Sequence, residues 1–330
     1  MRAAVATAQN HDDPLSGLVL QDVPVPAERP GWTRVRVVAA SLNPHDVWTL
    51  RGVGHPADRI PIVLGCDAAG WTPDGRAVVV HPVLGDPDAG GGDVTLDPAR
   101  ALLSETIDGA LAEHILVPTA NLVTKPESLT FDEAAALPVA WGTAYRMLFT
   151  RGELRAGQRV LVQGASGGVA SAAITLAHAA GARVYATART EEKRRFALEI
   201  GADAVFEPGS RLPERVDLVI ETVGESTWSH SMKALRPGGT IVVAGVTSGA
   251  NPPADLSRVF YLQQRVIGST GCTHAEFEAL LRLLDTTGAR PRIDRVIPLD
   301  DVVSGFEQLI AGTQLGKIVV RVSDPDATTA

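Results

Sequence analysis

The segment from residue 158 to residue 195 constrains the fold of this chain more than any other stretch. It reads QRVLVQGASGGVASAAITLAHAAGARVYATARTEEKRR. Its apolar, β-branched runs predict buried strands, and its alanine-rich middle has the periodicity of a helix. In order, the predicted elements are a strand at 160–162, a glycine turn at 164–168, a helix at 169–180 and a strand at 183–188.

A glycine turn between a strand and a helix is the setting in which a protein binds a dinucleotide. Glycine has no Cβ, so the backbone approaches a pyrophosphate closely, and the N–H groups at the start of the helix point at its charge. The spacing here is Gly164-x-x-Gly167-x-x-Ala170. The candidate cofactor contacts of this turn are Gly164, Ala165, Ser166, Gly167, Gly168 and Val169.

The end of the second predicted strand distinguishes NADP from NAD. An NAD site usually places Asp or Glu there to bind the ribose 2′-hydroxyl. This chain has Arg189 instead, followed by Lys193, and cations favour a 2′-phosphate. NADP(H) is therefore the expected cofactor. The alternative is that these cations only begin a solvated helix beside Glu191 and Glu192.

The composition and the net charge of the chain argue against several classes of protein. The chain has 330 residues, enough for two domains, and 45% of them are hydrophobic. No apolar run is long enough to cross a bilayer, and the first residues contain no apolar signal segment. Two cysteines without a CxxC pair favour the reducing cytoplasm, and a net charge of −8 argues against general affinity for nucleic acid.

The regions on either side of the glycine turn have different patterns. Short alternating runs separated by prolines predict a β-rich opening, as in Thr33–Ala40. Further apolar strands, Val216–Glu221 and Thr240–Ala244, alternate with helical segments later in the chain. That alternation is typical of a doubly wound parallel sheet, so the expected fold class is α/β.

This pattern resembles the medium-chain dehydrogenase/reductase superfamily, and several motifs carry the resemblance over nearly the full chain. They are SLNPHD at 41–46, GCDAAG at 65–70, AWGTAY at 140–145, GASGGVA at 164–170, DLVIETVG at 217–224, LRPGGTIVVAG at 235–245, IGSTGCTHAEF at 267–277 and LGKIVV at 315–320. The chain looks most similar to the zinc-independent quinone oxidoreductase branch. The resemblance implies a GroES-like catalytic domain formed by residues 1–124 and 269–330, and a Rossmann domain formed by 125–268.

Differences from the zinc-dependent members of this superfamily suggest a reaction without metal. Those enzymes have Cys where this chain has Asn43, His where it has Cys66, and a further Cys near Ala140. Three protein ligands are needed for a catalytic zinc. One alternative stays open, a rebuilt site from His45, Cys66 and His81.

The resemblance also implies which residues line the catalytic site. Asn43 is expected beside the nicotinamide ribose and the substrate, and Trp48 beside the substrate. The proton donor stays open: His45 is one candidate, with His55 and water as others. The Tyr that related enoyl-thioester reductases use as a donor aligns with Gly54. Each of these residues also has an ordinary structural interpretation, such as an Asn-Pro turn or a core aromatic.

Further cofactor contacts follow from the same motifs. They are Thr143, Val223, Gly224, Gly245, Val246, Thr247 and Lys317, with Lys317 expected to reach the cofactor phosphates. Residues 266–272 are expected to form an exposed edge strand. Such an edge favours pairing with a second copy, so a homodimer is expected.

The sequence thus predicts an NADPH-dependent oxidoreductase that transfers hydride to a quinone or an α,β-unsaturated carbonyl without metal. The alternatives are an enoyl-thioester reductase, a zinc-free alcohol dehydrogenase, and an NADPH-binding sensor with little turnover. The expected partner is a small electrophile, with neither nucleic acid nor membrane. The residues do not identify the physiological acceptor, because loops set specificity.

Overall fold

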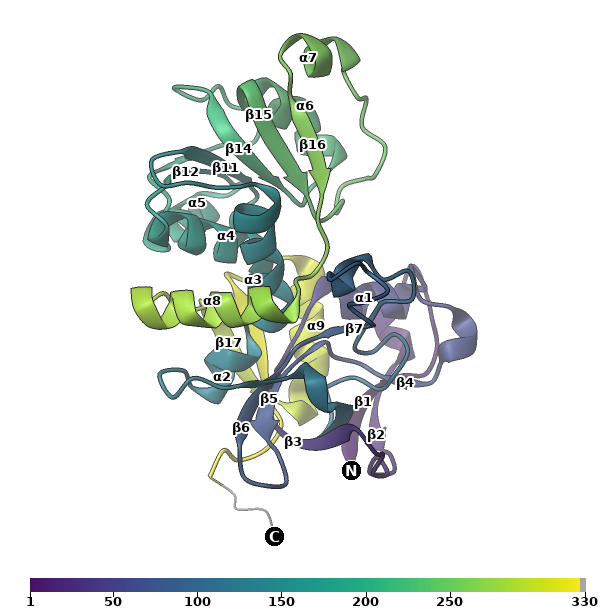
Figure 1. Ribbon diagram of the computed structural model, residues 1–330. Coiled ribbons are helices and arrows are strands. Elements are labelled where there is room, and N and C mark those ends of the chain that lie inside the picture. Colours follow the sequence, from purple (N-terminus) through teal and green to yellow (C-terminus); the bar gives the residue numbers. More distant parts are fainter. Residues whose placement is uncertain (327–330) are drawn as a thin grey trace. The chain divides into compact units, whose positions relative to one another are not determined.

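The computed structural model describes residues 1–326, which divide into two compact units (Figure 1). Unit 1 contains Met1–Val139, Thr273–Asp285 and the described residues from Ile293 on. Unit 2 contains Ala140–Cys272 and Thr286–Arg292. The sequence-based boundary at residue 124 lies earlier than the end of the first stretch of unit 1. Residues 125–139 belong with unit 1 because Phe131 packs on Trp71, with ring centroids 5.1 Å apart, and Asp132 pairs with Arg321.

Unit 2 is the expected parallel sheet with helices. Its strand order is β13-β12-β11-β14-β15-β16, and every neighbouring pair is parallel. The strands are β11 (Arg159–Gln163), β12 (Arg183–Thr187), β13 (Ala204–Phe206), β14 (Val216–Glu221), β15 (Leu235–Val243) and β16 (Arg265–Gly268). The helices are α4 (Gly168–Ala179), α5 (Glu191–Glu199), α6 (Glu225–Ala234) and α7 (Leu256–Tyr261). The α/β class and the parallel sheet predicted from the sequence are confirmed.

The order of this sheet reverses direction between β11 and β14, which lie side by side although β12 and β13 come between them in sequence. Ligands of open α/β sheets bind outside the carboxyl ends of the strands at such a point. The glycine turn follows β11 directly, so the fold puts it at this edge of the sheet.

Unit 1 is β-rich. Its largest sheet has the order β10-β6-β5-β3-β18-β17, with β9 also paired to β3. These strands are β3 (Trp32–Ser41), β5 (Asp67–Trp71), β6 (Ala77–Val80), β9 (His114–Pro118), β10 (Leu122–Thr124), β17 (Ile293–Pro298) and β18 (Lys317–Arg321). Smaller sheets join β1 (Arg2–Ala6), β2 (Leu18–Asp22) and β4 (Ile62–Val63), and β7 (Val83–Leu84) with β8 (Ala101–Leu102). Since β18 pairs with β3, the C-terminal part of the chain completes a sheet begun near the N-terminus.

The helices of unit 1 are short, apart from α8. They are α1 (Pro44–Arg51), α2 (Phe131–Ala135), α9 (Val302–Ala311) and most of α8 (His274–Thr287). Helix α3 (Pro138–Tyr145) begins at the end of unit 1 and leads into unit 2. Helix α3 ends at Tyr145, and Arg146–Arg151 forms a π-helical turn.

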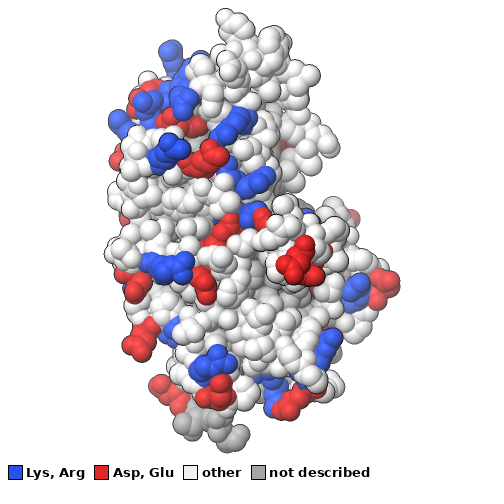
Figure 2. All heavy atoms as spheres, in the orientation of Figure 1, with Lys and Arg blue, Asp and Glu red and all other residues white. Residues whose placement is uncertain are grey.

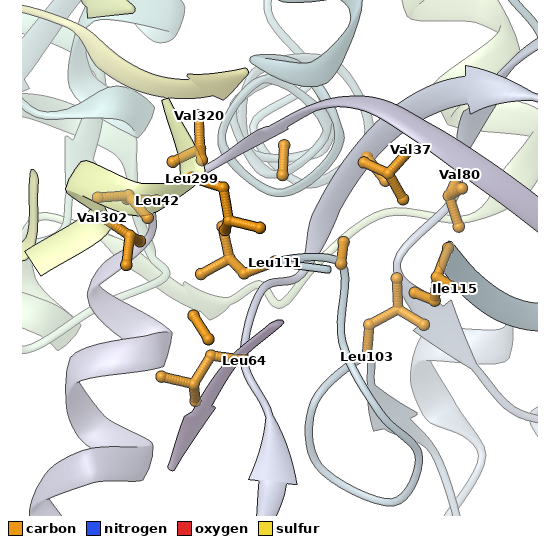
Figure 3. Packing of buried hydrophobic residues seen from close by; sticks show 14 of the residues in the cluster. Val37, Leu42, Leu64, Val80, Leu103, Leu111, Ile115, Leu299, Val302 and Val320 are labelled. Carbon is orange, nitrogen blue, oxygen red and sulfur yellow. The ribbon is translucent and has the colours of Figure 1, made fainter. Parts of the chain in front are cut away.

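Aliphatic side chains from both ends of the chain form the core of unit 1 (Figure 3). Val37, Leu64 and Leu111 belong to one buried cluster with Val302 and Val320, which come from the C-terminal part. Burying such side chains stabilises each by about 1.5–3 kcal/mol. The core therefore fixes α1 and the loops that carry the candidate catalytic residues.

In Figure 2, acidic and basic side chains lie beside one another over most of the face, whereas the upper right part is almost entirely white. Within residues 1–326, no helix is long and apolar enough to span a membrane.

Candidate functional site

The glycine turn of unit 2 has the geometry that a phosphate site needs. Gly164 has φ +76°, a conformation that side chains other than glycine rarely adopt. Gly167 is the residue before α4, and no side chain caps the helix there. A Cβ placed on Gly167 would meet no atom within 4 Å. The turn therefore leaves open space in front of uncapped helical N–H groups, where an anion is favoured.

A buried network of polar side chains lies at the strand ends next to this turn, and the sequence-based interpretation missed it. Thr187 Oγ1 donates to Gln163 Oε1 at 2.7 Å, and Gln163 Nε2 donates to Ser231 Oγ at 3.0 Å. Ser231 Oγ donates to Glu221 Oε2 at 2.6 Å, and Glu221 Oε1 accepts from the Gly224 N–H at 3.1 Å. The signal in the sequence was a polar residue ending each apolar strand. The network joins the carboxyl ends of β11, β12 and β14.

The two cations expected at a 2′-phosphate lie close together at the end of β12. Arg189 is exposed, and Lys193 is partly buried on the first turn of α5. Burial, and then the positive charge of Arg189, lower the pKa of Lys193. Each of these positive charges raises the electrostatic energy of the other, and an anion bound between them would lower it. Arg194 has a structural role, since its guanidinium donates to the Ala188 carbonyl and pairs with Glu191.

The remaining predicted contacts in unit 2 lie on α3 or at strand ends. Thr143 is buried on α3. Val223 and Gly224 follow β14, and Gly224 has φ +93°. Gly245, Val246 and Thr247 follow β15, with Val246 exposed. Their contacts with a cofactor stay predictions.

In unit 1, the motif NPHD begins α1. Asp46 is buried, and its carboxylate accepts from two main-chain N–H groups, those of Asn43 at 3.0 Å and Gly65 at 2.9 Å. Pro44 suits the first turn of a helix because it has no N–H to satisfy. Asp46 therefore fixes the start of α1 relative to the loop between β4 and β5, and His45 of α1 then lies against Cys66 of that loop.

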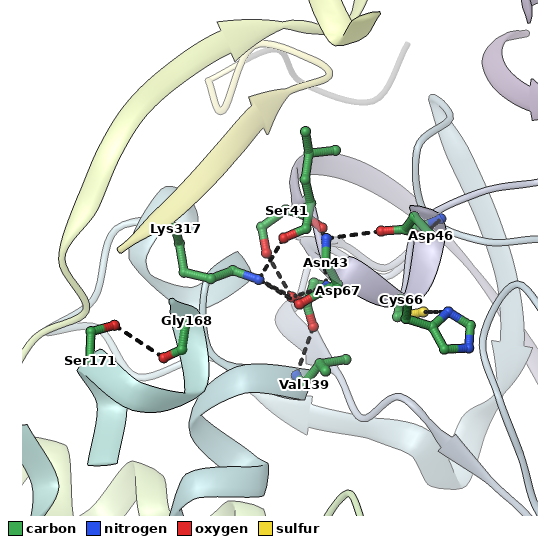
Figure 4. Close-up of polar contacts among 12 residues, drawn as sticks. Ser41, Asn43, Asp46, Cys66, Asp67, Val139, Gly168, Ser171 and Lys317 are labelled. Atoms are coloured by element: carbon green, nitrogen blue, oxygen red, sulfur yellow. Dashed lines mark hydrogen bonds and ion pairs between the residues drawn. The ribbon is translucent and has the colours of Figure 1, made fainter. Parts of the chain in front are cut away.

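Lys317 lies in a buried cluster with Asn43 and Asp67 (Figure 4). Its ammonium donates to Asn43 Oδ1 at 2.7 Å, to the Leu42 carbonyl at 2.9 Å and to Asp67 Oδ2 at 3.1 Å. These contacts account for the three hydrogens of the ammonium. The contact of Lys317 with cofactor phosphates stays a prediction, and it would require the exchange of one of these bonds.

The amide of Asn43 is held in one orientation by this cluster. An ammonium only donates, so the atom facing Lys317 is Oδ1. Nδ2 then donates to Asp67 Oδ2 at 2.8 Å and to the Ser41 carbonyl at 3.4 Å. Both amide hydrogens are thus used within unit 1. The expected contact of Asn43 with ribose and substrate stays a prediction, with a lone pair of Oδ1 left to accept.

His45 has a partner at each ring nitrogen. Nδ1 lies 3.3 Å from Cys66 Sγ, and Nε2 lies 2.8 Å from Glu105 Oε1. Burial lowers the pKa of His45, but the contacts with Cys66 and Glu105 outweigh it and raise the pKa well above the ordinary value of 6.5. Burial raises the pKa of the Cys66 thiol. The sequence had not singled out Glu105, because 60 positions separate it from His45.

Two further residues of this region were named from the sequence. Trp48 is partly exposed on α1, and the Arg51 guanidinium lies 5.5 Å from the centre of its ring. His55 is buried, and neither ring nitrogen has a hydrogen-bond partner within residues 1–326. Burial lowers the pKa of His55.

Two family models match the chain in the order of its parts. "Alcohol dehydrogenase GroES-like domain" matches residues 29–127, and "Zinc-binding dehydrogenase" matches residues 168–286. A crotonyl-CoA reductase of Streptomyces avermitilis is 30% identical over 95% of this chain and 84% of its own length. The chain belongs to the medium-chain dehydrogenase/reductase superfamily.

Other members of the superfamily are similar over almost the whole chain. A quinone oxidoreductase of Pongo abelii is 30% identical over 91% of this chain and 92% of its own length. A solved structure described as an NAD-dependent alcohol dehydrogenase is 33% identical, with TM-score 0.89, and covers 98% of this chain and 100% of its own. A 2-octenoyl-CoA carboxylase reductase in complex with NADP and 2-octenoyl-CoA is 28% identical, with TM-score 0.87, and covers 98% and 90%.

One of the matched models is named for zinc, a metal that His, Cys and Asp side chains bind in proteins. Donor atoms of His45, Asp46 and Cys66 lie within 4.8 Å of one another. However, both Asp46 oxygens accept hydrogen bonds from main-chain N–H groups, and His45 Nδ1 and Cys66 Sγ are hydrogen-bonded to each other. A family-type zinc centre needs three available protein ligands, so this set does not fit. The His81 of the alternative site is outside the group, and its ring packs on His274 and Phe277.

Proposed function

We propose that this protein is an NADPH-dependent reductase that adds hydride to a carbon–carbon double bond conjugated to a carbonyl, without a catalytic metal. The observation that carries the proposal is the commitment of the His45, Asp46 and Cys66 donor atoms to hydrogen bonds. Oxidation of an alcohol needs a stabilised alkoxide, which zinc supplies as a Lewis acid. A conjugated carbonyl already polarises its double bond, so it suits a site built from hydrogen-bonding side chains.

The cofactor is NADP(H), in agreement with the NADP-bound carboxylase reductase. The glycine turn at 164–169 holds the pyrophosphate, and Arg189 with Lys193 binds the 2′-phosphate. Thr143, the strand ends at 223–224 and 245–247, and Lys317 complete the proposed contacts. When bound, NADPH supplies the hydride.

The side chains of unit 1 are proposed to handle the other product of hydride addition, the negative charge on oxygen. His45 is the catalytic candidate for giving that oxygen a proton. Asn43 orients the reacting groups through its fixed amide, and Trp48 provides an apolar wall for the acceptor. Orientation and proton transfer are the contributions that a protein makes when a cofactor carries the redox chemistry.

Two acceptor classes follow from the relatives. The crotonyl-CoA reductase favours an enoyl thioester, and the quinone oxidoreductase favours a quinone. Both are conjugated carbonyl compounds, which is why one site without metal would suit either. The tyrosine donor of related enoyl-thioester reductases is absent at Gly54, which favours a quinone or a simple enone.

We propose a homodimer formed through β16, the edge strand of the unit 2 sheet. Val266 on this strand is 47% exposed, and Phe260 and Tyr261 of the neighbouring α7 are 73% and 78% exposed. Exposed apolar side chains beside an unpaired strand edge favour self-association. A cytoplasmic location stays a prediction.

The test is oxidation of NADPH by the purified protein with 1,4-benzoquinone, cyclohexenone or crotonyl-CoA as acceptor. Paired reactions replace NADPH with NADH, or follow exhaustive treatment with a chelator. We expect turnover with NADPH that survives the chelator. Loss of activity in the chelator, restored by zinc, would contradict the metal-free reaction. Tight NADPH binding without turnover on any acceptor would favour a sensor.

A further inference from the structure

Cys66, His45 and Glu105 form a series of contacts that runs from the interior of unit 1 toward its surface. Cys66 has no exposed surface, whereas the side chains of His45 and Glu105 are 22% and 30% exposed. Glu105 is itself fixed, since its Oε2 accepts from the Leu102 N–H at 2.7 Å. The carboxylate therefore meets the Nε2 atom of His45 in a defined position.

The acceptors in this series determine where the protons lie. Cys66 Sγ is 3.1 Å from the Leu103 carbonyl oxygen, which can only accept, so the thiol hydrogen points there. The sulfur is then free to accept from Nδ1–H of His45, and Glu105 accepts from Nε2–H. A hydrogen on each nitrogen makes the ring an imidazolium, in agreement with the raised pKa of His45.

Charges on every side of the ring agree with this assignment. Asp46, on the same helix, adds to the negative potential that raises the pKa of His45. Burial raises the pKa of Glu105, but the contacts with His45 and the Leu102 N–H lower it overall, so Glu105 is ionised. His55 opposes the imidazolium only if it is charged, and burial lowers its pKa. The contacts with Cys66 are the largest of the influences that raise the pKa of His45, and the hydrogen bond to the ionised Glu105 adds to them.

We propose that Glu105 and Cys66 are positioning residues for His45, which acts as a proton donor and is reprotonated after each turnover. Glu105 favours the proton on Nε2, and Cys66 fixes the orientation of the ring through Nδ1. The inference rests on the proposed reductase function and specifies how its proton is supplied. Nothing in the superfamily's motifs marked Glu105, which follows β8 in a loop. Of the two ring nitrogens, Nε2 is the one directed toward the more exposed partner.

Reduction of the acceptor consists of a hydride transfer and a proton transfer. Hydride from NADPH forms a C–H bond at the β-carbon of the acceptor, and the π electrons move to the carbonyl oxygen. The Nε2–H group of His45 exchanges its hydrogen bond to Glu105 Oε1 for one to that oxygen. The Nε2–H bond then breaks, its electron pair stays on nitrogen, and the hydrogen bonds to the oxygen. The products are NADP⁺, the enol of the reduced acceptor and neutral His45. Glu105 then favours uptake of a proton from water, because the imidazolium restores the ion pair.

The test compares Glu105→Gln with the intact enzyme in two measurements. Gln keeps the size of the side chain and an oxygen for the Leu102 N–H, but it removes the charge. NMR titration of the ring, assigned with His45→Gln, should show a lower pKa for His45 in Glu105→Gln. Because the protonated ring is the active form, kcat falls as the pH rises through this pKa. The fall should begin at lower pH in Glu105→Gln, with kcat reduced about tenfold or more at alkaline pH.

Matched variants separate this role from a general structural effect. Asp12→Asn removes the carboxylate from an exposed pair, in which His11 Nδ1 lies 3.1 Å from Asp12 Oδ1, and should leave both profiles unchanged. Glu105→Asp, with a carboxylate too short to reach, should behave like Glu105→Gln. The dissociation constant for NADPH should be equal in all of these variants.

Two results would overturn the inference in different ways. If the enzyme turns over and Glu105→Gln shifts neither the His45 titration nor the pH profile, the positioning role is wrong and the reductase function stands. If no acceptor is reduced by the intact enzyme, the reductase function fails, and the inference fails with it.

Discussion

The ammonium of Lys317 lies 2.7 Å from Oδ1 of Asn43, across 274 positions of the sequence. This contact joins the start of β18 to the residue before α1. It also fixes which end of the Asn43 amide faces Asp67. The C-terminal strand therefore does more than complete a sheet, because it sets the orientation of a candidate catalytic side chain.

Removing the charge of Lys317 should destabilise the protein strongly. In Lys317→Met, the buried carboxylate of Asp67 loses its cation and Asn43 Oδ1 loses a donor. Breaking a buried pair in this way costs about 3–5 kcal/mol of the free energy of unfolding. Urea denaturation measures the loss. The matched control is Arg2→Met at the Arg2–Asp300 pair, whose side chains are 43% and 78% exposed and whose loss should cost less than about 1 kcal/mol. Equal effects of the two substitutions would contradict the assignment.

The sequence predicted the parallel sheet of unit 2 because its signal is local. The glycine turn, the apolar runs and the helical periodicity all lie within one segment. Through the motifs of the superfamily it also named Asn43, His45 and Lys317 as candidates, and their roles stay predictions. It did not predict that Lys317 holds Asn43 or that Glu105 holds His45. Those pairings depend on how distant segments meet in unit 1, and no periodicity or spacing encodes them.

Substitutions in the glycine turn should separate an effect on the free energy of unfolding from an effect on NADPH binding. Gly167 has φ −74°, and a Cβ there meets no protein atom. Gly167→Ala should therefore change the free energy of unfolding by less than about 0.5 kcal/mol. The same methyl group would occupy the space in which the pyrophosphate approaches the backbone, so the dissociation constant for NADPH should rise about tenfold or more.

Gly164→Ala is the comparison for that substitution. Since Gly164 has φ +76°, alanine there should cost about 1 kcal/mol of stability as well as binding. Thermal denaturation and titration of the quenching of tryptophan fluorescence measure the two quantities. If Gly167→Ala bound NADPH as tightly as the intact protein, the pyrophosphate would not lie at this turn.

Arg189 should distinguish NADPH from NADH. A charge-assisted hydrogen bond contributes about 1.5–3 kcal/mol, so Arg189→Ala should weaken NADPH binding by about ten- to a hundredfold. NADH has no 2′-phosphate, and its dissociation constant should stay the same. Arg195→Ala is the matched control, because Arg195 is also exposed but lies further along α5. If Arg189→Ala weakened both cofactors equally, the residue would not be the 2′-phosphate contact.

The edge of the unit 2 sheet should determine the oligomeric state. Val266 on β16 is 47% exposed, and a lysine at that position would bring like charges together if two such strands paired around a two-fold axis. Val266→Lys should therefore convert a dimer into a monomer at micromolar concentration, as measured by sedimentation equilibrium. Val296→Lys is a close control, since Val296 is 45% exposed on β17, the edge strand of the large sheet in unit 1. If Val296→Lys were monomeric and Val266→Lys still dimeric, the interface would lie in unit 1 and not at β16.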